Sequence, residues 1–239
     1  NVAVSQGAVK AALSYVYMCM AGWPLNKGAE YYELAAQKAE EVIDLTDNGT
    51  YYYRLMDNYA DVYSLKHTQS NPEILLGVYY NRDRSPNAIP ATDFLLEMMQ
   101  AGWGDTNGEI KFWKEFPEGP RKDASYFPKI MLGDGQLHDW WYDTEPASRE
   151  VVAPIFMKTV EAAARGEEFD YTDPTKCTSS GQKTVHVIRL SEVYCWYAES
   201  VGRSGKVTQK AIDVLNKVRN RADGEQTNIY TASMSPAEL

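Results

Sequence analysis

Residues 186–224 read HVIRLSEVYCWYAESVGRSGKVTQKAIDVLNKVRNRADG and predict a helical hairpin. In the first half, apolar side chains recur every three or four residues, the spacing of one face of an α-helix. They are Leu190, Val193, Tyr194, Tyr197, Ala198 and Val201. Gly202 and Gly205 supply the backbone freedom that a helix end requires, and Thr208 is suited to cap a second helix. The short linker makes the two helices antiparallel neighbours.

The same pattern occurs near the start of the chain. The motif Leu-Ser-x-Val-Tyr-x-x-x-Ala begins at Leu13 and again at Leu190. The apolar positions of the helix that follows also correspond. The pairs are Ala35 with Ala211, Ala39 with Leu215, and Val42 with Val218. Two helices matched in the same order predict a helix-pair repeat of the tetratricopeptide kind, interrupted by a long insertion.

The remaining regular elements are few. We expect the first helix pair at about Ser5–Ala21 and Ala29–Asp44, with a short helix or turn at Tyr59–Leu65. Apolar runs between turn residues predict strands at Glu73–Tyr80 and Lys183–Ile188. The predicted fold is therefore mainly α, with tetratricopeptide-like helical hairpins, a long irregular loop-rich insertion and a few short strands.

The chain divides into three regions in a single, incomplete structural domain. Residues 1–80 would form the first helix pair and the following strand, and residues 186–239 the second pair. Residues 81–185 form the irregular, aromatic-rich insertion, and such long loops usually carry function. Ser235 and Glu238 make a capping box for a helix that Leu239 cuts short. We therefore expect this chain to be a fragment of a longer protein.

Charge and cysteine content exclude several classes of protein. The net charge of −9 argues against nucleic-acid binding, because no excess cation displaces counterions from phosphate. Cys19, Cys177 and Cys195 are too few and too widely spaced for a disulfide framework or a zinc site. Cys19 and Cys195 fall within helical stripes, where we expect small core side chains. No cofactor or metal is predicted.

Catalytic motifs are absent from the sequence, including nucleophile elbows, zinc-protease signatures and dinucleotide fingerprints. Glu192 and Glu199 lie seven residues apart on a helix, and we expect them to pair with arginines. The candidate arginines are Arg189, Arg219 and Arg221. A glycoside hydrolase, which would need two suitably separated carboxylates, therefore remains the less favoured interpretation.

Aromatic side chains favour sugar binding. The chain has 17 tyrosines and six tryptophans, and sugar rings pack their C–H faces on such side chains. The densest cluster is His138–Asp143, where three consecutive aromatics are flanked by aspartates. The predicted glycan-binding residues are Trp140, Trp141, Tyr142, Asp139 and Asp143, followed by Trp103 and Trp113. The alternative is that one tryptophan of the adjacent pair belongs to the core.

The segments RLSEVYCWYAES at 189–200 and AIDVLNKVRNRADG at 211–224 resemble the SusD/RagB family of glycan-binding lipoproteins of Bacteroidetes. The matching positions are Arg189, Glu192, Ala198, Glu199, Asn216, Val218, Arg219, Arg221 and Ala222. The early segment AALSYVYMCMAGWPLNKGAEYYELAAQKAEEVID at 11–44 is also similar to the family. Gly119–Arg121 stands where the family often has an Asp-Pro-Arg turn, without the aspartate.

The resemblance implies a non-catalytic protein that binds an oligo- or polysaccharide at the cell surface. It would deliver the glycan to a SusC-like TonB-dependent transporter during nutrient uptake. It would sit on the extracellular face of the outer membrane, held by a lipid anchor outside this sequence. The alternative class is a helical-repeat adaptor that binds a peptide or protein on its concave face and has no affinity for sugars.

Overall fold

The computed structural model describes residues 4–87, 108–131, 137–138, 153–172, 177–178 and 180–239. The chain forms two compact units. The first, unit 1, comprises residues 1–57, 71–78 and 185–239. The second, unit 2, comprises residues 58–70 and 79–184. Each unit has its own organisation, and each is described by itself below.

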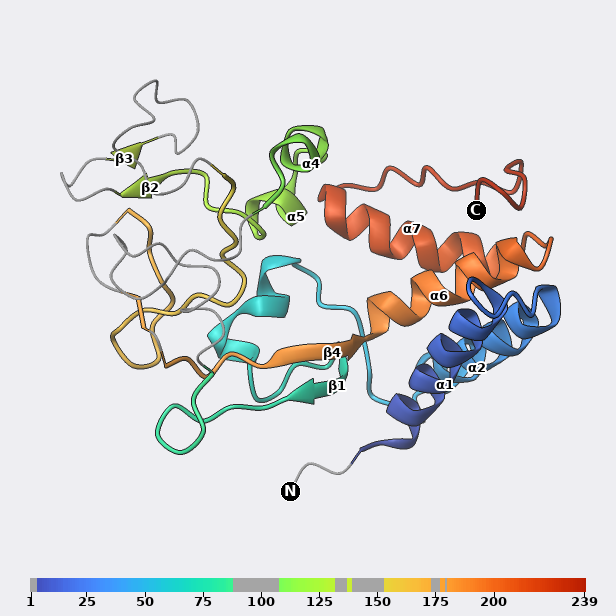
Figure 1. The fold of residues 1–239 in the computed structure, drawn as a ribbon, viewed down its shortest axis with the longest axis horizontal. Helices are drawn as coiled ribbons and strands as arrows, with labels where there is room; N and C mark the ends of the chain where they lie inside the picture. Colours follow the sequence, from blue (N-terminus) through green and yellow to red (C-terminus); the bar gives the residue numbers. More distant parts are fainter. Residues whose placement is uncertain (1–3, 88–107, 132–136, 139–152, 173–176, 179) are drawn as a thin grey trace. The chain divides into compact units, whose positions relative to one another are not determined.

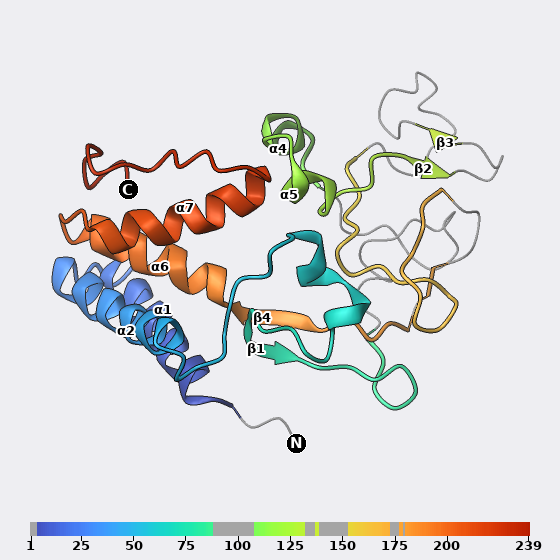
Figure 2. The same cartoon turned by 180° about the vertical axis from the view of Figure 1, so that it is seen from behind.

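Unit 1 contains the two predicted helical hairpins (Figure 1). The first hairpin is α1 (Gln6–Ala21) with α2 (Ala29–Asp47), and the second is α6 (Leu190–Arg203) with α7 (Gln209–Asp223). Helix α2 packs against α6, so that the second helix of one hairpin contacts the first helix of the next (Figure 2). The prediction of a mainly helical fold with paired hairpins is confirmed.

Helix ends follow the capping residues. The Ser5 hydroxyl accepts a hydrogen bond from Ala8 N at 3.1 Å, and Thr208 Oγ1 accepts one from Ala211 N at 3.2 Å. Gly224 ends α7 in the left-handed conformation, with φ of 77°, which glycine adopts at little cost. Helix α2 continues to Asp47, three residues past its predicted end at Asp44.

The core of unit 1 lies between α2 and α6. Ala35, Ala39 and Val42 on one helix are fully buried, as are Leu190 and Val193 on the other. The small alanines let the two backbones approach closely while the branched side chains of α6 fill the space between them. The apolar spacing in the sequence therefore identifies the buried face correctly.

Two strands join the hairpins to the insertion. β1 (Ile74–Val78) pairs antiparallel with β4 (Val185–Arg189), so that Ile74 lies opposite Arg189 and Val78 opposite Val185. These are the two predicted strands, and they bring the beginning and the end of the insertion together.

Two predictions for unit 1 are wrong. Cys19 and Cys195 are exposed, not buried. Helix α1 is apolar on nearly every side, so its sequence does not mark the core face at Cys19, and Cys195 lies beside the buried stripe of α6. Ser235 N donates to the Glu238 carboxylate at 2.7 Å as in a capping box, but described residues 225–239 form turns and no helix.

The described residues of unit 2 form short elements. In the described part they are η1 (Ala60–Tyr63), η2 (Leu65–His67), α4 (Ile110–Glu115), α5 (Pro120–Asp123), β2 (Ile130–Met131) and β3 (Leu137–His138). Buried polar contacts join distant segments. Glu161 is 2% exposed, and its Oε1 accepts hydrogen bonds from Gln182 N at 2.5 Å and Lys183 N at 2.6 Å. Thr184 Oγ1 donates to Thr68 O at 2.7 Å. Among the described residues, no helix is both long and apolar enough to cross a bilayer.

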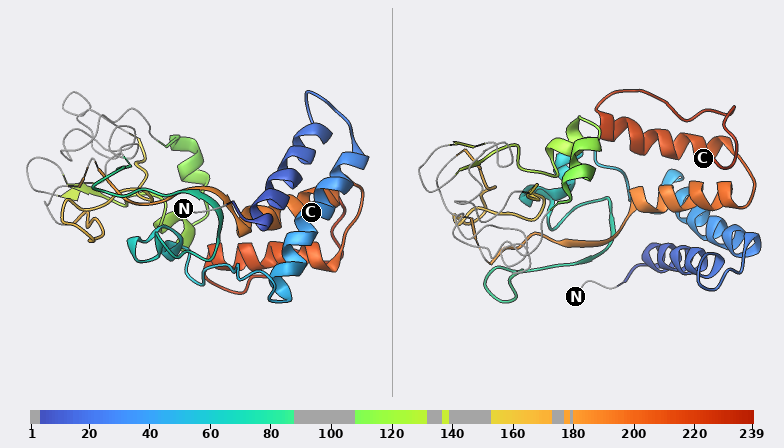
Figure 3. Two further views of the ribbon diagram at one scale, coloured as in Figure 1. Left: turned by 90° about the horizontal axis from the view of Figure 1, so that it is seen from below. Right: turned by 45° about the horizontal axis from the view of Figure 1, so that its top comes forward.

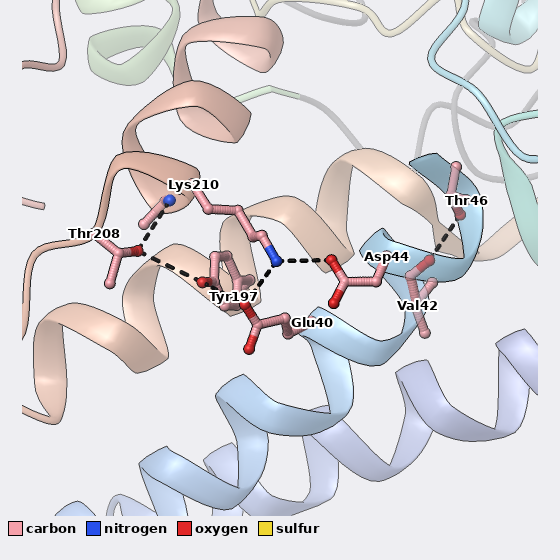
Figure 4. Close-up of polar contacts among 8 residues, drawn as sticks. Glu40, Val42, Asp44, Thr46, Tyr197, Thr208 and Lys210 are labelled. Atoms are coloured by element: carbon pink, nitrogen blue, oxygen red, sulfur yellow. Dashed lines mark hydrogen bonds and ion pairs between the residues drawn. The ribbon is translucent and has the colours of Figure 1, made fainter. Parts of the chain in front are cut away.

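A polar cluster joins α2, α6 and α7 on the surface of unit 1 (Figure 4). The Lys210 ammonium donates to Glu40 and to Asp44, each at 2.7 Å, and the Tyr197 hydroxyl donates to Glu40 at 3.2 Å. Burial lowers the pKa of Lys210, but the hydrogen bonds to Asp44 and Glu40 outweigh burial and raise it above its usual value. Lys210 is therefore charged at neutral pH.

Lys210→Met should destabilise the protein by about 1 kcal/mol, because it leaves Glu40 and Asp44 facing each other without a cation. Urea unfolding measures the change. Since the pKa of Lys210 is raised on folding, its contribution is complete below the unfolded pKa and is lost only as pH rises through the folded pKa. The loss should thus be the same at pH 7 and pH 9. Lys206→Met, which breaks an exposed pair with Glu33, is the matched control and should change stability much less. An equal loss in both variants would contradict a special role for Lys210.

A second prediction concerns Glu41, which joins α1 to α2. Hydrogen bonds from Lys38 at 2.5 Å and Lys10 at 2.9 Å lower the pKa of Glu41. Its contribution to stability is therefore present above the unfolded pKa of about 4.5 and disappears as pH falls through the folded pKa. Glu41→Gln should be less stable than the parent at pH 7, and the difference should shrink at pH 3. A difference that is independent of pH would rule out the ion pairs as its origin.

A third prediction concerns the buried pair Glu73–Arg221, whose side chains are 0% and 6% exposed. Glu73→Gln leaves the arginine charge buried without its partner and should cost about 3–5 kcal/mol. The urea midpoint should fall with an unchanged slope. Glu199→Gln removes an exposed pair with Arg203 and should cost less than about 1 kcal/mol. If the two variants were equally stable, the pair would not be the principal ionic contact of unit 1.

Candidate functional site

Most of the predicted glycan platform lies outside the described residues. Trp140, Trp141, Tyr142, Asp139 and Asp143 fall within 139–152, and Trp103 falls within 88–107. The platform at these residues stays a prediction. Trp113 is the one member of the predicted set that the structure places, and the site below is built around it.

Trp113 stands on α4, a short helix that its own N-cap stabilises. The Glu109 carboxylate accepts hydrogen bonds from Lys111 N at 2.9 Å and Phe112 N at 2.5 Å. These hydrogen bonds lower the pKa of Glu109 and keep the cap ionised. The Trp113 ring is half-buried, and the Lys122 ammonium lies 4.3 Å from the ring centroid, within the range of a cation–π contact.

Lys122 reaches the ring because α5 begins at Pro120. Gly119 precedes it with a φ of 136°, a conformation that other residues avoid, and proline is favoured at the first position of a helix. Lys122 is only 6% exposed and donates to Glu118 at 2.5 Å, so its charge is both paired and held against the indole.

These residues line a cavity of about 430 Å³ in unit 2. Its walls are Trp113, Glu118, Lys122, Asp123, Tyr126, Phe127, Pro128, Met157 and Tyr171. Phe127 stands edge-on to Tyr171, with 6.2 Å between the ring centroids. Burial raises the pKa of the Tyr126 phenol, which therefore stays protonated at neutral pH and can donate a hydrogen bond.

A second cavity of about 300 Å³ shares the walls Phe127 and Met157. Lys158 lies over the Tyr63 ring at 4.8 Å, and Lys183 pairs with Glu168 at 2.8 Å. These charges are therefore engaged within the protein, as Lys122 and Glu118 are in the first cavity. The first cavity has the better surface for stacking, because the partly exposed rings of Trp113 and Tyr171 line it.

The first cavity combines apolar rings with hydrogen-bonding groups of both kinds. Trp113 and Tyr171 are partly exposed and offer apolar ring surface, whereas Tyr126 is only 6% exposed, and Glu118 and Asp123 supply acceptors. Such a mixture suits a ligand whose apolar faces alternate with hydroxyl groups. Within the described ranges, no cluster of three or more metal-ligating side chains occurs.

The sequence did not single out Tyr126, Tyr171, Lys122, Asp123 or Glu118. They come from separate irregular segments, where no periodicity marks which side chains converge. The proline-bounded stretch Pro120–Pro128 was the available signal, since five of the described wall residues lie in it: Lys122, Asp123, Tyr126, Phe127 and Pro128.

Glu192 and Glu199, the glutamates considered in the sequence analysis for a glycoside hydrolase, line neither cavity. Glu192 contacts Arg189 at 3.4 Å, and Glu199 contacts Arg203 at 2.7 Å, so arginine–glutamate pairing in the C-terminal hairpin is confirmed. The assignment of Arg219 is wrong, because it pairs with Asp223 one turn along its own helix at 2.7 Å.

Comparison with known proteins identifies the fold. The SusD family model matches residues 158–234. No curated protein matches the chain. A solved SusD superfamily protein from Parabacteroides distasonis superposes with a TM-score of 0.70 at 20% identity, over 98% of this chain and 47% of that one.

Two other similar structures carry names that mention sugars. Surface glycan-binding protein A from Bacteroides uniformis matches at 20% identity and a TM-score of 0.61, over 98% of this chain and 45% of its own. A structure solved with a xylogluco-oligosaccharide matches at 21% identity and a TM-score of 0.65, over 92% and 44% of the respective chains. The chain thus spans about half the length of these structures. Residues 158–234 belong to the SusD/RagB family, and the chain as a whole has the SusD fold.

Proposed function

We propose that this protein binds glycans without cleaving them, as part of a surface apparatus for nutrient uptake. The cavity around Trp113, Tyr126 and Tyr171 is the observation that carries the proposal. The SusD fold supports it, as do the sugar-related names of two similar structures. The predicted platform at Trp140, Trp141 and Tyr142 would extend the same aromatic surface or replace it.

Stacking would supply most of the binding energy. When a sugar ring packs on the Trp113 indole, apolar surface of both the sugar and the indole is removed from water. By analogy with aromatic pairs and cation–π contacts, one such stack contributes about 1–2 kcal/mol. A flexible sugar loses much freedom on binding, so we expect affinities in the micromolar to millimolar range.

The proposal extends to partner and location through the likeness to the family. The bound glycan would pass to a SusC-like TonB-dependent transporter, and a lipid anchor outside these residues would hold the protein on the outer face of the outer membrane. Co-purification of a tagged protein with a transporter from solubilised membranes tests this part. Recovery of the protein in the soluble fraction, with no transporter, would count against it.

A glycan array followed by calorimetry tests the site itself. Trp113→Ala should weaken binding about 5- to 30-fold, since the stack contributes about 1–2 kcal/mol. Phe112→Ala is the matched control, because this ring lies on the same helix, is 56% exposed and does not line the cavity. The control should bind as the parent does.

If Trp113→Ala binds normally while Trp140→Ala or Trp141→Ala loses affinity, the platform lies at 139–143 and not in the cavity. If no glycan binds at all, the result favours the alternative class, a helical-repeat adaptor that binds a peptide or protein. Release of shortened products from a bound glycan, abolished by Glu118→Gln or Asp123→Asn, would establish a hydrolase instead.

A further inference from the structure

Three charged side chains line the first cavity, namely Lys122, Glu118 and Asp123. They belong to one stretch of unit 2, in which α4 and α5 adjoin each other (Figure 3, green). The Lys122 side chain is buried, its ammonium lies 4.3 Å from the centroid of the Trp113 ring, and it donates to Glu118 at 2.5 Å. The cation of the described walls is therefore already neutralised by a carboxylate.

Asp123 is the wall carboxylate whose charge is not compensated. It is exposed at the last position of α5. Its carboxylate forms no ion pair with the residues that the structure describes, whereas the Glu118 carboxylate holds Lys122. Two carboxylates and one ammonium group leave the described walls with one negative charge.

The other cations of residues 109–131 do not line the cavity. They are Lys111, Lys114, Arg121 and Lys129. Arg121, the neighbour of Lys122 in the sequence, lies over the Phe116 ring at 5.2 Å from its centroid. Phe116 is not a wall residue, so this guanidinium is directed at a ring outside the cavity.

The sequence of the rest of the insertion adds negative charge. Residues 132–152 contain Arg149 as their one lysine or arginine, against five acidic residues. The acidic residues are Asp134, Asp139, Asp143, Glu145 and Glu150. Residues 88–107 contain acidic residues and neither lysine nor arginine. The long-range field of these segments therefore has the same sign as the charge of the cavity walls.

This charge distinguishes between kinds of sugar. The hydroxyl groups of an uncharged sugar can donate charge-assisted hydrogen bonds to Asp123 and Glu118. A sugar with a carboxylate or sulfate group would instead bring a second negative charge close to Asp123. It could reach Lys122 only by displacing Glu118, and both wall carboxylates would then remain beside it.

We propose that the cavity selects glycans built from uncharged sugars and that Asp123 excludes sugars with a carboxylate or sulfate group. This inference rests on the proposed function, because it names the class of glycan that the same cavity takes. Asp123 acts as a specificity-determining residue, and Lys122 contributes no free cation because Glu118 neutralises it.

A glycan array gives the first test, since it should select uncharged glycans. Selection of carboxylated or sulfated glycans alone would overturn the proposal. One selected oligosaccharide is then oxidised at C6, and calorimetry compares the resulting carboxylate with its methyl ester, which has a similar size and no charge. The carboxylate should bind about tenfold more weakly than the ester, as a like charge a few ångströms away in a partly hydrated cavity requires.

Asp123→Asn should lower this ester-to-carboxylate affinity ratio at least about threefold, because it removes the opposing charge and keeps the shape of the side chain. Asp61→Asn is the matched control. It changes the net charge of the protein equally, but Asp61 lines the second cavity and not the first, so the ratio should stay as in the parent. An unchanged ratio in Asp123→Asn, or an equal change in both variants, would overturn the role of Asp123.

A measurement on the parent protein covers the case in which Asp123→Asn does not fold. Since Asp123 is exposed, the ratio should fall as NaCl is raised from about 0.05 M to about 0.5 M, which shortens the range of its field. A ratio that does not depend on salt would overturn the proposal. If carboxylate and ester bind equally and Trp113→Ala weakens both, the proposed function stands and the selection against charged sugars is wrong. If no glycan binds, the proposed function itself is contradicted.

Discussion

The buried carboxylate of Glu73 is the contact on which unit 1 depends. Its Oε2 accepts hydrogen bonds from Met56 N at 3.0 Å and from the Arg221 guanidinium, and its backbone oxygen accepts one from Leu190 N at 2.9 Å. The segment after the first hairpin, the start of α6 and the end of α7 therefore meet at one residue. A buried charge is tolerated here because hydrogen bonds and a counter-charge compensate its lost hydration.

This contact has a consequence for the insertion. Glu73 precedes β1, and Leu190 follows β4, so the chain leaves and re-enters the helical frame at neighbouring points. Because the two ends of the insertion are held together by β1 and β4, its sequence and length can vary without disturbing the hairpins. Unit 2 has its own polar contacts at Glu161, Thr68 and Thr184, which hold loops together where its described residues form only short helices and strands.

The sequence predicted the helices whose apolar residues recur at regular intervals. Leu190, Val193 and their repeat partners mark helix faces, so the hairpins are predictable from the order of the residues alone. The pair Glu73–Arg221 spans 148 positions, and no local pattern joins such residues. The cavity was not predictable for the same reason. Trp113 was predicted as a glycan-binding residue after the cluster at 139–143, but the segments that bring Tyr126 and Tyr171 to the same cavity converge only in the folded chain. Cys19 was misplaced because α1 has apolar residues on nearly every side, so its sequence does not show which side is covered.

The proposed function is tested most directly by finding which aromatic ring contacts the sugar. The indole N–H signals of the six tryptophans can be followed by NMR while an oligosaccharide found by glycan array is added, with the Trp113 signal assigned through Trp113→Phe. The Trp113 signal should shift saturably, with the dissociation constant found by calorimetry. A glycan that shifts other indole signals and leaves Trp113 unmoved would contradict binding in the cavity.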